Sequence, residues 1–138
     1  MELNDEIYDK IVELSEEGDA LFEAQDFIGA IKKFKNALEL IPEPKYMWEA
    51  STWVFTALGD VYFHLEDYHE AKNYFYDAFN CPEGMGNPYI LLRLGQNLYE
   101  NCEKEKAKEY LLKAYMLEGQ DIFEEEDPKY IKLIQELI

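Results

Sequence analysis

The chain of 138 residues is poor in several features that define other classes of protein. It holds only two cysteines, Cys81 and Cys102, neither of which has a histidine or cysteine at metal-ligand spacing, so we expect both to be reduced and buried. It has no hydrophobic run near the ~20 residues of a membrane span and no hydrophobic or arginine-rich targeting segment at its start. These absences predict a cytoplasmic protein that does not enter membranes.

Basic residues are also scarce, with 13 Lys and Arg against 30 Asp and Glu, and the formal net charge is -17. This charge repels phosphate backbones and anionic membrane surfaces, which argues against nucleic-acid and membrane partners. It attracts cationic proteins, and that attraction weakens as salt rises. We therefore expect a basic protein as the partner, the alternative being that the carboxylates only keep the protein soluble.

Motifs that mark catalysis, cofactors or metals are missing as well. The two histidines, His64 and His69, do not form an HExxH zinc motif, and the glycines of residues 84–86 lack the Lys-Ser/Thr pair of a phosphate loop. The acidic run of residues 124–127 lacks the spacing of a calcium loop, so we interpret it as a solvated link. We predict that the protein is not an enzyme and has no catalytic residue, no cofactor and no metal.

The sequence does contain an internal repeat centred on Gly18, Gly59 and Gly95. Each glycine is followed twelve residues later by an alanine, and seven residues further on by a second; these are Ala30, Ala37, Ala71, Ala78, Ala107 and Ala114. Between the two alanines lies a large apolar residue, which is Phe34, Phe75 or Leu111. Small residues let two antiparallel helices cross closely, and the large residues fill the space between neighbouring helix pairs.

These residues resemble the tetratricopeptide repeat, a helix-turn-helix pattern of about 34 residues. The resemblance implies an all-α fold, an α-α superhelix of three repeats with a C-terminal capping helix. The predicted arrangement is one domain spanning residues 1–138, with repeats near 11–44, 52–85 and 88–121 and the cap at 128–138. Helix pairs are expected near 4–24 with 27–40, 44–65 with 68–80, and 88–101 with 104–118.

The first helix of the second repeat is expected to begin early, because no helix breaker follows Pro44. This extension would lift Tyr46, Met47 and Trp48 above the body of the domain. These side chains could then meet a second copy of the chain, so a homo-oligomer is left open.

The resemblance also implies a protein-binding groove, because the first helix of each repeat lines the concave face in that family. Carried over to this chain, and with Trp48 added, the groove comprises Ser15, Asp19, Glu23, Trp53, Thr56, Asp60, His64, Tyr89, Gln96, Glu100 and Trp48. Carboxylates and aromatic rings alternate there, an arrangement that favours Arg and Lys side chains, with Trp53 and Asp60 expected to matter most. A subclass of the family grips acidic chaperone tails with lysines, asparagines and an arginine. The corresponding positions here are Ser15, Asp19, Ala57, Tyr89 and Arg93, of which only Arg93 is basic, so that role is not expected.

The chain further resembles small tetratricopeptide proteins encoded beside bacterial polymorphic toxins, through the runs GNPYILLRLGQ at 86–96 and AYMLEGQDIFEEEDPKY at 114–130. That resemblance implies a bacterial immunity protein that captures and neutralises one basic toxin domain. The alternatives are a general scaffold or chaperone-like adaptor and, third, an enzyme carried on a helical solenoid. Fold alone does not choose among them.

Overall fold

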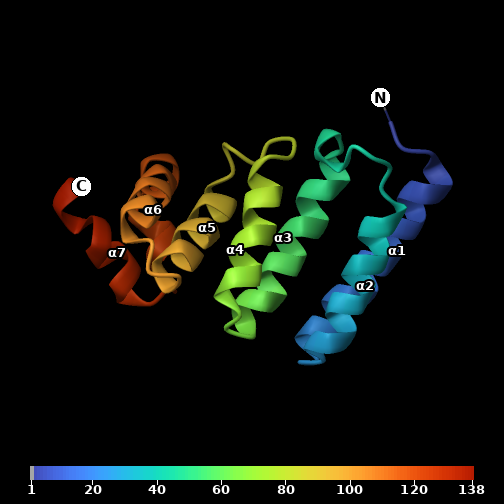
Figure 1. The fold of residues 1–138 in the computed structure, drawn as a ribbon, viewed down its shortest axis with the longest axis horizontal. Helices are drawn as coiled ribbons and strands as arrows, with labels where there is room; N and C mark the ends of the chain where they lie inside the picture. The colour runs from blue at the N-terminus through green and yellow to red at the C-terminus, as the bar shows by residue number, and fades with distance from the viewer. Residues whose placement is uncertain (1) are drawn as a thin grey trace.

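The computed structural model describes residues 2–138 and shows seven α-helices in this part of the chain, with short 3-10 turns and no strand. Three helix pairs and a final single helix follow one another along the long axis, from α1 at one end to α7 at the other (Figure 1). The pairs are α1 (Asp5–Glu23) with α2 (Phe27–Leu40), α3 (Glu49–His64) with α4 (Tyr68–Phe79), and α5 (Pro88–Glu100) with α6 (Lys104–Glu118). The capping helix is α7 (Pro128–Ile134), so the predicted α-α superhelix is confirmed.

Local sequence signals explain where these helices begin and turn. Side-chain oxygens accept hydrogen bonds from free backbone N–H groups at the starts of five of the seven α-helices, and the residues that do so are Asn4, Asp26, Asp67, Asn87 and Asp127. In each pair the chain reverses through one residue with positive φ, which is Gln25, Glu66 or Cys102. The same turn therefore recurs at the same place in all three pairs.

The three repeated glycines lie where the two helices of a pair cross. A Cβ atom added at Gly18 would lie 2.7 Å from the Phe34 ring, and one added at Gly59 would lie 2.7 Å from the Phe75 ring. At Gly95 the neighbour is Leu111, at 2.6 Å. These contacts are closer than a side chain tolerates, which confirms the packing role predicted for the glycines.

The core divides into an N-terminal and a C-terminal part, each shared by neighbouring helix pairs, and a small third cluster of Phe55, Ala78, Cys81 and Ile90. Tyr130 and Ile134 of the capping helix are buried in the C-terminal part, where they cover the third pair. Both cysteines are free thiols, but only Cys81 is buried. Cys102 is exposed because it occupies the positive-φ turn between α5 and α6, so the expectation of burial is wrong for this residue.

The prediction that α3 begins early is wrong. Lys45–Met47 form a separate 3-10 turn, Trp48 has extended backbone, and α3 begins only at Glu49. The indole of Trp48 is 9% exposed and packs into the N-terminal core, while Tyr46 and Met47 remain at the surface. Burial of so large an apolar ring stabilises the fold, and it requires the chain to leave the helical path just before α3.

Candidate functional site

The eleven residues predicted to bind a partner fall into two groups. Those on α5 and at the C-terminal end of α3 are already bonded to other groups of the chain. Those on α1 and at the N-terminal end of α3 are not. From the first group, Asp60, Tyr89 and Gln96 belong to the Arg93 site, which comprises Asp60, Phe63, Tyr89, Arg93, Gln96 and Glu126. The second group belongs to the open groove between α1 and α3. Trp48, Thr56, His64 and Glu100 belong to neither, because each is buried or bonded elsewhere in the chain.

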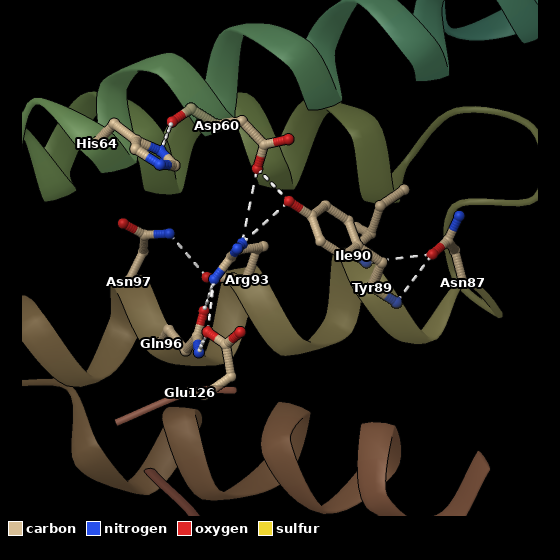
Figure 2. Close-up of polar contacts among 9 residues, drawn as sticks. All are labelled: Asp60, His64, Asn87, Tyr89, Ile90, Arg93, Gln96, Asn97 and Glu126. Atoms are coloured by element: carbon tan, nitrogen blue, oxygen red, sulfur yellow. Dashed lines mark hydrogen bonds and ion pairs between the residues drawn. The ribbon is translucent and has the colours of Figure 1, made fainter. Parts of the chain in front are cut away.

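The Arg93 site is a network of hydrogen bonds around one guanidinium group (Figure 2). Nε of Arg93 donates to the Tyr89 hydroxyl at 3.1 Å, and Nη1 donates to Gln96 Oε1 at 2.8 Å and to Glu126 Oε1 at 2.7 Å. The Tyr89 hydroxyl in turn donates to Asp60 Oδ1 at 2.6 Å, and that oxygen lies 3.6 Å from Arg93 Nε. The network joins α3, α5 and the segment before α7.

Aromatic rings complete the surroundings of this guanidinium. Its central carbon lies 4.7 Å from the centroid of the Phe63 ring and 5.1 Å from that of Tyr89, within the range of cation–π attraction. The Arg93 side chain is only 13% exposed. Burial raises the pKa of Asp60, while the hydrogen bond from Tyr89 and the charge of Arg93 act in the opposite direction. A single arginine is thus shared by two carboxylates.

Two expectations are corrected by this geometry. Asp60, expected to be a leading carboxylate for a partner, is instead paired within the chain. Glu126, interpreted as part of a solvated link, has a side chain only 19% exposed and bonds to Arg93 and Gln96. The acidic run is solvated only in part, because the partly buried Arg93 needs a second carboxylate.

Other predicted residues also have partners within the chain. Glu100 accepts hydrogen bonds from Lys129 and Tyr130 of α7, and the Thr56 hydroxyl donates to the Thr52 carbonyl oxygen. His64 Nδ1 lies 3.1 Å from the Asp60 carbonyl oxygen, and its ring meets that of Phe22 edge-on. Trp48 is buried, as described above. None of these side chains offers its polar group freely on the predicted groove.

The open groove contains a cavity of about 200 Å³ between α1 and α3. Its lining comprises Ile11, Val12, Ser15, Glu16, Asp19, Phe34, Trp53 and Ala57. The indole of Trp53 is 47% exposed, although it belongs to a residue type that folding normally covers. The structure therefore brings the predicted residues Ser15, Asp19 and Trp53 together around one cavity, and Glu23 lies one helical turn beyond Asp19.

A second cavity, of about 280 Å³, continues the open groove toward the start of α1. Its lining comprises Glu2, Leu3, Asp5, Tyr8, Trp48, Glu49, Ala50 and Trp53. Trp53 lines both cavities, and its ring meets the Tyr8 ring edge-on with centroids 6.3 Å apart. The repeat pattern missed Tyr8, Asp5 and Glu49 because they precede the family positions used for the prediction.

The carboxylates of the open groove lack cationic partners. Within residues 2–138, no ion pair involves any of Glu2, Asp5, Glu16, Asp19, Glu23 and Glu49. Burial raises the pKa of Asp19, and the like charges of Glu23 and Glu16 raise it further. The groove therefore combines uncompensated negative charge with an exposed aromatic ring, and a cation is the group that would relieve it.

The described part of the chain was also compared with the requirements of a metal site and of a membrane span. Residues 2–138 contain no group of three or more His, Cys, Asp and Glu side chains placed to hold a metal ion. None of the helices in this range is both long enough and apolar enough to cross a membrane.

Known proteins support the assignment of the repeat. The family model for the tetratricopeptide repeat matches residues 54–80, in the second helix pair. No curated protein sequence matches the chain. Among solved structures, the C-terminal TPR-containing domain of an FK506-binding protein from Plasmodium falciparum aligns with a TM-score of 0.79 at 22% identity, covering 99% of this chain and 93% of that chain.

Two other solved structures of similar fold contain bound peptides. The first TPR of Spaghetti (RPAP3), bound to the HSP90 peptide SRMEEVD, aligns with a TM-score of 0.72 at 18% identity and covers 94% of both chains. The Yersinia enterocolitica type III secretion chaperone SycD, in complex with a peptide of the translocator YopD, aligns at 0.72 and 16% identity over 94% of this chain and 92% of that chain. The fold of the chain is thus that of tetratricopeptide-repeat proteins.

Proposed function

We propose that the protein is a non-enzymatic protein-binding module that captures one basic protein through the open groove. The observation that carries the proposal is the set of unpaired carboxylates around Trp53, in a protein whose formal net charge is -17. An exposed tryptophan next to carboxylates suits lysine and arginine side chains, which gain both cation–π and charge-assisted contacts. Tryptophan is also among the residues that contribute most to binding when an interface covers it.

An acidic peptide is a poor ligand for this surface. The peptide in the RPAP3 structure contains two glutamates and an aspartate, as its letters show. In the present chain, Arg93 is the cation that would favour such a ligand, and it is already neutralised by Asp60 and Glu126. An acidic segment would meet the unpaired carboxylates of the open groove instead, and like charges brought together cost binding energy.

Within this class, we propose that the partner is a bacterial toxin domain and the protein its cytoplasmic immunity protein. The proposal rests on the resemblance of residues 86–96 and 114–130 to proteins encoded beside polymorphic toxins, and on charge. A domain that attacks nucleic acid benefits from a basic surface, so an acidic inhibitor is complementary to it. A scaffold or chaperone-like adaptor would instead bind several partners weakly, and the experiment below separates the two.

The test is affinity capture from a lysate of the source cell at low and at high salt, with bound proteins identified and their stoichiometry measured. The expected result is one basic protein, held one-to-one at low salt and released at high salt. Trp53→Ala and Asp19→Lys should each weaken its binding by more than ~1 kcal/mol, measured by titration of the purified partner.

Matched substitutions on other faces serve as controls. Met116→Ala removes a side chain that is 75% exposed on α6, and Glu39→Lys reverses an exposed charge on α2. Both should leave binding unchanged. Equal retention by the groove variants and the controls would reject the open groove as the binding surface, and weak capture of many proteins would favour a scaffold over an immunity protein.

A further inference from the structure

Two faces lie between neighbouring helix pairs. The first, between α1 and α3, holds the open groove, and the second, between α3 and α5, holds the Arg93 site. Both faces are built from corresponding sequence positions. When the repeats are aligned on Gly18, Gly59 and Gly95, the residues of the Arg93 site on α3 and α5 have counterparts one repeat earlier, whereas Glu126 lies outside the repeats. Asp60 corresponds to Asp19, Tyr89 to Trp53, Arg93 to Ala57, and Gln96 to Asp60. The first face therefore repeats the carboxylate and the aromatic ring of the second but has alanine in place of arginine.

The second face shows how these positions act when an arginine is present among them. The aspartate lies 3.6 Å from the guanidinium, the aromatic residue one turn before the arginine stacks with it at 5.1 Å, and the glutamine one turn after accepts a hydrogen bond at 2.8 Å. The arginine is thereby held from three sides by residues of α3 and α5. The Arg93 site therefore shows, within the same molecule, that this arrangement of residues binds an arginine side chain.

The first face leaves the corresponding space open. The cavity of about 200 Å³ is lined by Ala57, where the arginine would begin, and by Asp19 and Trp53, which would contact it. The charge of Asp19 is among the causes that raise the pKa of Asp60, the counterpart of Gln96. No cation of the chain pairs with Asp19 within residues 2–138.

The two faces also differ in the contacts that they offer to an arginine side chain. Phe22 corresponds to Phe63, but its ring packs edge-on against His64 at 4.8 Å and does not line the cavity. Glu16 adds a carboxylate to the cavity lining. The residue that aligns with Glu16 one repeat later is Ala57, so the Arg93 site has no carboxylate at that position. The open face thus lacks one aromatic contact, and its second carboxylate is Glu16 of α1 where the Arg93 site has Glu126.

From this correspondence we infer that the cavity between Asp19, Trp53 and Ala57 is a site for one arginine side chain of the protein partner. The inference rests on the proposed function, which supplies the partner. Arginine fits better than lysine because its planar guanidinium can stack on the Trp53 indole while its fork of N–H groups reaches the carboxylates of Asp19 and Glu16, which line the cavity. Lysine offers a point charge without the stacking face.

A tripeptide titration tests the site without any knowledge of the partner. The probe is blocked Gly-Arg-Gly, compared with Gly-Lys-Gly and with the neutral isostere Gly-citrulline-Gly, followed by the indole N–H signals of the protein in NMR spectra. The chain has two tryptophans, and the buried Trp48 lines only the second cavity, so its signal reports whether a peptide binds there instead. We expect the Trp53 signal to shift saturably with the arginine peptide, with about tenfold weaker binding of lysine and no saturation with citrulline.

The variant Ala57→Arg should abolish this response, because its own side chain would occupy the cavity as Arg93 occupies the second face. Asp19→Asn, which removes charge without changing shape, should weaken arginine binding at least about fivefold. Circular dichroism of both variants checks that the fold is retained. An unchanged Trp53 signal in the wild-type protein, equal binding of the arginine and citrulline peptides, or an undiminished response of a folded Ala57→Arg variant would each overturn the arginine site.

Failure of this inference is distinguishable from failure of the proposed function. If a basic protein is captured by the wild type and equally well by Ala57→Arg, the groove binds a partner but the arginine site is wrong. If the tripeptide binds as expected and no basic protein is captured at low salt, the arginine site stands and the protein-binding function is wrong.

Discussion

The interface between the first and second helix pairs differs from that between the second and third chiefly in one cation. In the C-terminal interface Arg93 is enclosed by two carboxylates, two aromatic rings and a glutamine. In the N-terminal interface Ala57 stands at the corresponding position, and Asp19 and Trp53 face a cavity. The same repeat thus yields a closed face when the chain supplies its own arginine and an open one when it does not.

The comparison shows that position within a repeat does not decide whether a residue can bind a partner. Asp19 and Asp60 occupy equivalent positions on α1 and α3, yet only Asp60 accepts a hydrogen bond and an ion pair from the chain itself. Charge left uncompensated in a folded protein costs stability and is a sign of function.

The largest effect is expected for Arg93→Ala. This change leaves Asp60 and Glu126, whose side chains are only 25% and 19% exposed, without their cation. We expect a loss of about 2–4 kcal/mol in the free energy of unfolding, measured by urea denaturation. Lys113→Ala, which breaks an exposed pair with Glu109 on α6, should cost less than about 0.5 kcal/mol. If Arg93→Ala lowers the free energy of unfolding no more than Lys113→Ala does, the network around Arg93 does not stabilise the fold.

A second pair of changes tests whether the two regions are alike apart from charge. Gly18→Ala and Gly59→Ala both place a methyl group 2.7 Å from a phenylalanine ring, so each should destabilise the protein by about 1–3 kcal/mol, and by similar amounts. Gly86→Ala is the control, because no other atom lies within 4 Å of an added Cβ there. Thermal or urea unfolding of the three variants gives the values, and a large inequality between Gly18 and Gly59 would mean that packing also separates the two regions.

Removing one carboxylate from each interface should have unequal effects, although burial raises the pKa of both carboxyls. Asp60→Asn weakens a charge-assisted network and should cost about 1 kcal/mol. Asp19→Asn relieves repulsion from Glu16 and Glu23 and should be neutral or stabilising by at most about 0.5 kcal/mol, while weakening the partner. Urea denaturation of both variants at low ionic strength measures the difference. Equal destabilisation by the two changes would remove the distinction between a filled and an open site.

The pH dependence of the Asp19→Asn difference is the smallest expected effect. Because the folded state raises the pKa of Asp19 above its ordinary value of 3.8, the wild-type carboxyl lowers stability only where it is ionised. Below the ordinary value the carboxyl is neutral in both the folded and unfolded states, so the two proteins should differ least there. The advantage of the variant should grow as pH rises through the raised pKa and then level off. An advantage that shrinks with rising pH would contradict the sign of this shift.

The helix pairs were predicted from the resemblance of the repeat to the tetratricopeptide pattern, and Gly18, Gly59 and Gly95 and the paired alanines are buried where antiparallel helices cross closely. The prediction failed at Lys45–Trp48, where the nonlocal burial of one indole outweighed the local helical preference of the segment. The candidate site was predicted only in part for a similar reason. Whether Asp60 is free depends on Arg93 and Glu126, and Glu126 lies outside the repeat positions that identified the groove.

The most direct test of the central claim, that the open groove is an arginine site lacking its arginine, is a double-mutant cycle between Ala57→Arg and Asp19→Asn. The free energies of unfolding of the wild type, the two single variants and the double variant are measured by urea denaturation. We predict that the new arginine stabilises the protein by about 1 kcal/mol more when Asp19 is present than when it is asparagine. A coupling energy of zero, with all four proteins folded, would contradict the account.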